Sequence, residues 1–465
     1  MANSSLTQPS CRNSRNIHQD IMNTKRFVLI MAAFFSIIPL SAQNYHWETD
    51  LHHRLLYDFS KTHEEVKSYI QQYIPDVTDQ EMNAWEKTGA LEVKIIDGQK
   101  LYFNNAGPNL FRINDRCKKI KETKDGIEKE GYETTDESNV PLIIKGAPHN
   151  PYHIAEPKQI RITYTISVKA DAVPDGETVR CWMPFPRRDI KRQQNIKLLS
   201  TSEKSYILSP EEYAHSSLYM EKKAEKGKPT VFSESFEFTS FGSWFNLKPE
   251  NIRPYDENSP LYKTYTSERD RHIIFTPRLY QLADSLTQGI NNPLLKAKKI
   301  FTWINSHFPW ASAREYSTIE NIPEYVLENH HGDCGQVTLL FLTLCRICGI
   351  PAHFESGFML HPHSENLHDW GEIYFEGIGW VPVDMSFGIP SYAKNAEESY
   401  FFLGGIDSWR MVVNSDFSIP LYPEKTYPRS ETVDFQRGEV EWKGGNLYFD
   451  KWNWKLSAEN TEEKL

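Results

Sequence analysis

Cysteine is scarce in this chain, with six residues among 465. Five of them lie beyond the N-terminal region: Cys117, Cys181, Cys334, Cys345 and Cys348. A disulfide framework uses a denser and usually even set of cysteines, so this chain is not held together by disulfides. An odd number in an exported protein leaves at least one thiol free or paired between molecules.

The chain also lacks an excess of positive charge. Lys and Arg number 52 against 62 Asp and Glu, which gives a formal net charge of -10 at pH 7. Nucleic acids and anionic membrane surfaces reward clustered Lys and Arg. The sequence therefore argues against a nucleic acid as partner.

Long apolar runs are absent as well. The run from Phe27 to Ile38 follows Lys25-Arg26 and is shorter than the roughly 20 residues that span a bilayer. With a small residue at Ala42, this order is typical of a signal peptide cleaved after Ala42. Residues 1–42 are interpreted as an N-terminal extension and signal peptide, with Met22 as a candidate initiator. We expect an exported protein, periplasmic or secreted, without an integral membrane segment.

Length and pattern divide the remaining chain into several modules, since domains usually hold about 100–200 residues. Residues 43–145 are predicted to form a small α/β module: a helix follows the capping box that starts at Thr78, and a hairpin turns at Asp97-Gly98. The charged stretch from Cys117 to Val140 is interpreted as a linker or mobile loop at the end of this module.

Residues 146–250 alternate between apolar and polar side chains, as in the strand around Ile160 to Val168. Repeated strands with turn signals predict an antiparallel β-sandwich.

From about residue 255 the period becomes helical, with helices opening at Pro277, Pro293 and Pro323. Strands follow from Ala352, so 255–414 is predicted to be an α+β domain. Residues 415–465 are interpreted as a C-terminal β extension that packs on this α+β domain.

Cys334 begins an apolar helix that runs to Gly349 and carries Gly332 and Gly335 on its flanks. A helix N-terminus stabilises an anion, so we expect a lowered thiol pKa and backbone N–H groups that hold an oxyanion. The flanking glycines would let a substrate approach the backbone closely. The pattern favours a nucleophile over a small residue that fills space.

A cysteine nucleophile needs a base and a group that orients the base. His368 starts a strand, and residues 368, 370, 372 and 374 point to one side while Asp369, Ile373 and Phe375 point to the other. The turn at Gly377 returns the chain to Asp384, and hairpin geometry sets this carboxylate close to His368. Cys334, His368 and Asp384 are therefore the candidate nucleophile, base and orienting carboxylate.

These blocks, GDC at 332–334, HDWGEIYFEGIGW at 368–380 and VD at 383–384, resemble the transglutaminase-like superfamily over roughly residues 270–390. The resemblance implies a papain-like cysteine fold with Cys334, His368 and Asp384 as catalytic triad. It also implies an aromatic residue near the oxyanion hole, for which Trp310 is the candidate and a core position the alternative. The candidates for oxyanion or substrate contacts are Trp310, Gly335, Gln336 and Trp370.

Two other clusters are less favourable. Cys345 and Cys348 lie late in the apolar helix, where core packing explains them better than redox chemistry. His361, His363 and His368 lack a neighbouring carboxylate or thiol at ligand spacing, so no metal site is predicted. The sequence predicts no cofactor and leaves calcium dependence open.

The predicted reaction is attack of Cys334 on an amide of a peptide or protein, through a thioester. Water as acceptor makes the enzyme a peptidase, amidase or deamidase, which we expect; a lysine amine makes it a crosslinking transglutaminase. Some relatives of the family remove glycans from asparagine. A different class remains open, a non-catalytic scaffold that binds peptides or glycans.

Overall fold

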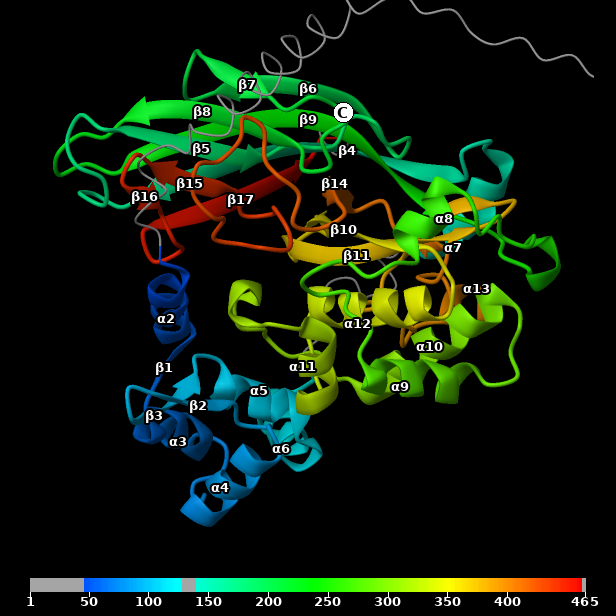
Figure 1. Ribbon diagram of the computed structural model, residues 1–465, viewed down its shortest axis with the longest axis horizontal. Helices are drawn as coiled ribbons and strands as arrows, with labels where there is room; N and C mark the ends of the chain where they lie inside the picture. The colour runs from blue at the N-terminus through cyan, green and yellow to red at the C-terminus, as the bar shows by residue number, and fades with distance from the viewer. Residues whose placement is uncertain (1–45, 128–138, 462–465) are drawn as a thin grey trace, which may run out of the picture. The chain divides into compact units, whose positions relative to one another are not determined.

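The computed structural model describes residues 46–127 and 139–461 (Figure 1). The predicted signal peptide and residues 128–138 of the predicted charged linker lie outside the described residues. Within them, no helix has both the length and the apolar character that a membrane crossing requires. All five described cysteines are free thiols.

The first module contains five helices and a three-stranded sheet of order β1-β3-β2 in its described residues. Its elements are α2 (Trp47–Asp58), β1 (Phe59–Lys61), α3 (His63–Gln71), α4 (Asp79–Lys87), β2 (Val93–Ile96), β3 (Gln99–Phe103), α5 (Ala106–Ile113) and α6 (Asp115–Asp125). The predicted capping box at Thr78 and the predicted hairpin are both present.

Helix α6 corrects the interpretation of Cys117 to Val140 as a linker. Asn114 caps the helix by accepting a hydrogen bond from the Cys117 N–H at 3.1 Å. Cys117 is buried in the core of the first module and Ile120 packs against that core. Lys and Glu are good helix formers, so a charged composition did not exclude a helix here.

Two antiparallel sheets follow, each with five strands among the described residues. One has the order β13-β9-β4-β17 with β6 also on β9, and the other has the order β16-β15-β5-β8-β7. Their strands are β4 (Ile154–Val168), β5 (Thr178–Pro184), β6 (Gln193–Thr201), β7 (Tyr206–Leu208), β8 (Ser217–Lys223), β9 (Thr230–Trp244), β13 (Gly405–Ile406), β15 (Glu439–Trp442), β16 (Gly445–Asn446) and β17 (Trp452–Asn460). Side chains from both sheets, such as Phe236 and Trp182, bury into one shared core.

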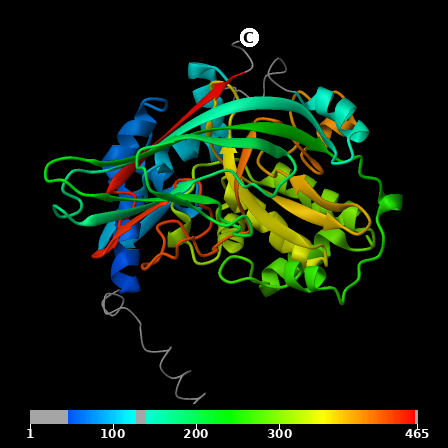
Figure 2. The ribbon, with the colours of Figure 1, turned by 90° about the horizontal axis from the view of Figure 1, so that it is seen from above.

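The C-terminal segment packs on the α+β domain, where Phe417 and Val433 join its core, and it also completes these two sheets, which the sequence did not predict. Strand β17 pairs with β4 from Trp452 opposite Val168 to Asn460 opposite Ile160. In Figure 2 the red C-terminal strand runs along the teal strand β4. Strand β15 pairs with β5 in the same way. These pairings join segments almost 300 residues apart, which local periodicity does not reveal.

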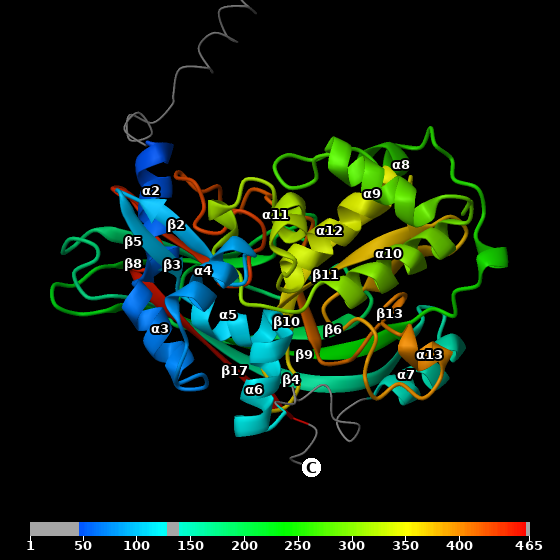
Figure 3. The ribbon, with the colours of Figure 1, turned by 90° about the horizontal axis from the view of Figure 1, so that it is seen from below.

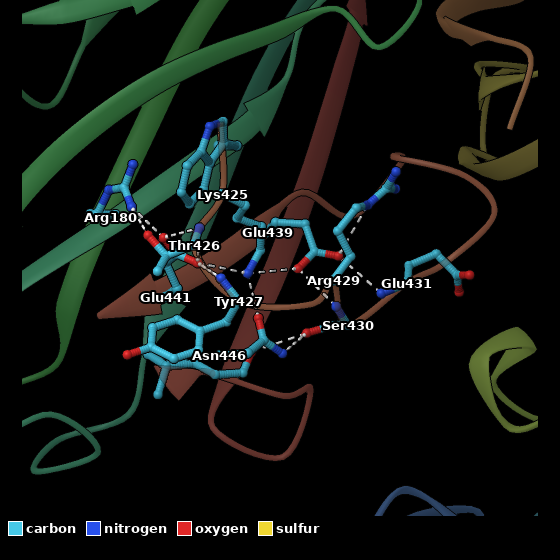
Figure 4. A network of polar contacts seen from close by, with 12 residues as sticks. Arg180, Lys425, Thr426, Tyr427, Arg429, Ser430, Glu431, Glu439, Glu441 and Asn446 are labelled. Carbon is cyan, nitrogen blue, oxygen red and sulfur yellow. Dashed lines mark hydrogen bonds and ion pairs between the residues drawn. The ribbon is translucent and has the colours of Figure 1, made fainter. Parts of the chain in front are cut away.

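A buried polar network fixes the chain between β14 (Arg410–Ser415) and β15. Glu441 accepts from the backbone N–H groups of Thr426 and Tyr427 and pairs with Arg180 and Lys425 (Figure 4). Such buried carboxylates need this many donors, because an unpaired buried charge is costly. The network holds the C-terminal segment against β5.

The α+β domain has a four-stranded sheet of order β12-β11-β10-β14 in its described residues. Its elements are α8 (Pro260–Tyr265), α9 (Pro277–Thr287), α10 (Pro293–His307), α11 (Ile322–Asn329), α12 (Cys334–Ile347), β10 (Ala352–Met359), β11 (Asn366–Phe375), β12 (Gly379–Val383), α13 (Ala396–Ser399) and β14 (Arg410–Ser415); a short helix α7 (Val140–Gly146) precedes β4. Helices α9, α10 and α12 lie on one face of this sheet (Figure 3). The helix starts predicted at Pro277 and Pro293 and the helix at Cys334 are observed.

Helix α12 is the centre of this domain. Its residues from Gly335 to Arg346 are all buried, and its leucines pack against the sheet and against α9, α10 and α11. Burial of a leucine side chain stabilises the fold by about 1.5–3 kcal/mol. The first residue of a helix held this firmly is a well-fixed position.

Candidate active site

Cys334 is the first residue of α12. Asp333 caps α12: its carboxylate accepts from the Gln336 N–H at 3.0 Å, and the Gln336 side chain accepts from the Asp333 N–H at 3.2 Å. Gln336 is fully buried, so the structure gives this predicted substrate residue a capping position. Cys334 itself is partly exposed and lines a cavity.

His368 and Asp384 come from adjacent strands. Strand β11 carries His368 near its start, and Asp384 directly follows β12, which pairs with β11. His368 Nε2 lies 2.8 Å from Asp384 Oδ2, which matches the proximity expected of the hairpin. His368 lines the same cavity as Cys334.

Asp384 is held by more than the histidine. Its second oxygen accepts from the backbone N–H groups of Ser386 and Phe387, each at 3.0 Å. Arg410 is fully buried and lies 2.9 Å from the Asp384 carboxylate, and it also pairs with Asp407. Burial acts to raise the pKa of Asp384, but His368 and Arg410 outweigh it and lower that pKa.

The state of His368 follows from the same surroundings. Burial lowers its pKa, and Asp384 opposes this effect without reversing it. The imidazole is therefore neutral near pH 7 and able to accept a proton. The ionised Asp384 then fixes its orientation.

The thiol of Cys334 has a partner that the sequence did not suggest. It donates to Asp369 Oδ2 at 3.5 Å. Burial, Asp369 and Asp333 raise the pKa of this thiol well above its usual value. The expectation of a lowered pKa was therefore wrong, because burial of the thiol, together with the carboxyl groups near the helix start, opposes the effect of the dipole on its pKa.

Asp369 sits in its own buried setting. Gln436 Nε2 donates to Asp369 Oδ1 at 2.6 Å and to the His368 carbonyl at 2.7 Å. The Tyr316 hydroxyl donates to Asp333 at 2.7 Å and to Asp369 at 3.3 Å. Burial, Asp434 and Asp333 raise the pKa of Asp369 well above its usual value. This carboxyl therefore retains its proton at higher pH than an exposed aspartate.

Asp369 was missed although the alternation of the strand contained the signal. The sequence placed Asp369 on the face of Ile373 and Phe375, opposite to His368. Those two residues are buried in the core beneath the sheet, where α12 packs on β11. The start of α12 is therefore on the side to which Asp369 points.

Gly335 lets the start of α12 pack closely against Tyr316 and Asp369. A Cβ atom at this position would overlap the Tyr316 hydroxyl and the Asp369 carboxyl. The close approach that requires glycine is thus to these two side chains, where the sequence analysis expected a substrate. Trp370 also has a structural position, because it is fully buried and its indole N–H donates to Glu355 at 2.8 Å.

Trp310, the aromatic residue that the family resemblance suggested, lies at the surface. It is 46% exposed, which excludes the alternative of a core aromatic. It lines the cavity with Cys334, and its backbone forms a parallel bridge with Gly332. The arrangement joins a thiol, a neutral imidazole with an oriented carboxylate, and an exposed indole around one cavity.

The sequence around this site matches a known protein family. Residues 280–385 match the family profile described as the transglutaminase-like superfamily. This region is a transglutaminase-like core. It contains Cys334 and His368 and ends one residue beyond Asp384.

Three individual proteins also resemble part of this chain. The uncharacterized protein YebA of Bacillus subtilis is 25% identical over 172 residues, which is 30% of this chain and 23% of YebA. A structure of a candidate cysteine protease from Cytophaga hutchinsonii aligns with 16% identity and a TM-score of 0.44, over 66% of this chain and 92% of that one. The periplasmic domain of TgpA from Pseudomonas aeruginosa aligns with 15% identity and a TM-score of 0.28, over 56% and 93%.

Proposed function

We propose that the protein is a cysteine hydrolase that cleaves amide bonds of peptides or proteins, with Cys334 as nucleophile, His368 as base and Asp384 as the residue that orients the base. The observation that carries this proposal is the shared cavity. Cys334 and His368 both line it, and Asp384 holds the imidazole at 2.8 Å from behind. A scaffold that only bound peptides would not need this arrangement.

The steps follow from the protonation states. At rest the thiol is protonated, since its pKa is raised. As sulfur bonds to the amide carbon, the thiol proton passes to neutral His368, and the carbonyl oxygen becomes an oxyanion. Backbone N–H groups at the start of α12 are suited to hold that oxyanion.

The oxyanion collapses, the carbon–nitrogen bond breaks, and His368 gives its proton to the leaving amine. A thioester on Cys334 remains. Water then attacks this thioester and passes one proton to His368, and the acid leaves as the thiol recovers that proton. We favour water as acceptor because bulk water is present at far higher concentration than any amine.

The test is incubation with a peptide library and a tagged amine, followed by mass analysis of the products. Loss of a peptide bond or a gain of about 1 Da at an amide supports hydrolysis; incorporation of the amine would instead make the enzyme a crosslinking transglutaminase. Cys334→Ala and His368→Gln are expected to abolish product formation. Cys348→Ala is the matched control, since this partly buried thiol lies at the far end of the same helix. No product from the wild type would overturn the proposal.

Export completes the proposed function. It rests on the sequence, where the basic pair Lys25-Arg26, the apolar run and Ala42 follow one another in the order of a signal peptide. N-terminal sequencing of the mature protein from its native cells checks this. We expect the mature chain to begin at Gln43, and an intact N-terminus would contradict export by cleavage.

A further inference from the structure

The cavity in front of Cys334 has two walls, and the first module supplies one of them. The cavity measures about 940 Å³ and is lined by Trp310, Cys334 and His368 on one side. On the other side lie residues of α3, α5 and α6 and the chain just beyond α6, among them Tyr73, Phe111, Arg112 and Lys118. In Figure 3 the cyan helix α5 lies between the blue helix α3 and the helices α11 and α12.

From this wall we propose that residues 47–127 form the substrate-recognition half of the active site and select peptides that carry acidic groups next to an apolar side chain. The inference rests on the proposed function, because it concerns the same cavity. It assigns a role to the first module and a chemical class to the substrate.

The wall is fixed to the transglutaminase-like core. Asn109 on α5 donates to the Ser312 carbonyl at 2.9 Å and accepts from the Ser312 N–H at 3.0 Å, two residues from Trp310. Asp58 at the end of α2 accepts from the Thr318 hydroxyl at 2.9 Å. Tyr325 on α11 donates to Glu92 of the first module at 2.8 Å. A buried two-way bond such as the one at Asn109 gives the wall a defined position relative to Cys334.

The chemistry of the wall is cationic and aromatic. Arg112, Lys118 and Lys121 line the cavity, and among its described lining residues Glu122 is the single acidic one. The whole chain carries a net charge of -10, so this local excess of cations is opposite to the general surface. A cleft lined by one sign of charge concentrates ligands of the other sign.

Apolar surface adjoins these cations. The rings of Tyr73 and Phe111 are in tilted contact with their centroids 4.6 Å apart, and the Arg112 guanidinium lies 5.0 Å from the Trp310 ring centroid. Leu367 and Phe387 face the cavity from the other wall. A peptide with its scissile carbonyl at Cys334 would place an apolar side chain on these rings and a neighbouring carboxylate near Arg112 and Lys118.

The experiment measures binding in a Cys334→Ala background, so that it does not depend on turnover. The experiment compares three labelled peptides that share one apolar residue. They differ only in the residue next to it, which is Glu, Gln or Lys. We expect the order of affinity to be Glu, then Gln, then Lys, with the preference for Glu weakening as salt rises.

Lys118→Glu tests the wall, and Lys119→Glu is its matched control. Both lysines are exposed on α6, and Lys118 lines the cavity. Reversal of the Lys118 charge replaces attraction by repulsion, and we expect a loss of about tenfold in affinity for the Glu peptide with little change for the Gln peptide. Lys119→Glu should leave both affinities within about twofold of the parent.

Equal affinity for the Glu and Gln peptides, equal effects of the two lysine variants, or no binding of any peptide would overturn the inference. A preference for the Glu peptide without hydrolysis by the wild type would support this inference while contradicting the proposed function. Hydrolysis by the wild type without discrimination between the Glu and Gln peptides would support the proposed function and contradict this inference.

Discussion

The contact between Cys334 and Asp369 makes a prediction that separates this site from one with a permanently ionised thiol. Asp369→Asn keeps the size of the side chain and keeps one oxygen to which Gln436 can donate. It removes the titratable carboxyl that lies 3.5 Å from the sulfur. Because Asp369 contributes to the raised pKa of the thiol, we expect the variant thiol to ionise at lower pH.

The magnitude follows from the distance. Two full charges at 3.5 Å interact by about 5 kcal/mol at an effective dielectric constant of about 20, which corresponds to about 3.5 pKa units. Asp369 has a raised pKa itself and so carries its charge over only part of the pH range. We therefore expect the pKa of Cys334 to fall by about one unit or more.

The assay is the rate of alkylation by iodoacetamide between about pH 5 and 10, with each cysteine followed by peptide mass analysis. The midpoint for Cys334 should move to lower pH in Asp369→Asn. Cys348 is an internal reference, since it lies far along α12 and contacts Thr287 instead. A midpoint for Cys334 that stays in place or rises would refute the reasoning.

Three further predictions concern the support of the site. Arg410→Met leaves Asp384 and Asp407 as buried carboxylates without their guanidinium, so we expect a loss of about 3–5 kcal/mol in the free energy of denaturant unfolding, and an unchanged value would contradict the ion pairs. Burial and Asp434 raise the pKa of Glu431 to about 8, so the folded state holds its proton above the unfolded pKa and stability falls as pH rises from about 4.5 to 8. Glu431→Gln should therefore reduce the drop in Tm between pH 6 and 8.5, and an equal drop in both proteins would be inconsistent with that burial. Gly335→Ala should lower the Tm and shift the alkylation profile of Cys334, because the new Cβ displaces Asp369 and Tyr316, and a variant identical to wild type in both measurements would show that the packing tolerates it.

Local signals in the sequence predicted much of the site. The run of apolar residues after Cys334 defines α12, and the alternation around His368 together with the turn at Gly377 defines the β11–β12 hairpin. Each of these features depends on residues close together in the chain. That is why the proximity of His368 to Asp384 could be expected.

Features that depend on distant segments were not predictable in this way. Gln436 donates to Asp369 across 67 positions, and Asn109 meets Ser312 across 203. The strand pairing of β17 with β4 is of the same kind. The helix dipole alone predicted a thiol of lowered pKa, whereas tertiary packing buries Cys334 and brings Asp369 beside it, and both effects raise that pKa.

The central claim is that Cys334 carries the acyl group during turnover. The most direct test mixes the enzyme rapidly with a peptide that it cleaves, quenches the reaction with acid and measures the mass of the intact protein. The account predicts a transient increase equal to the acyl portion of the peptide, located on Cys334 after digestion and absent from Cys334→Ala. Full cleavage by Cys334→Ala, or an acyl group on another residue, would contradict it.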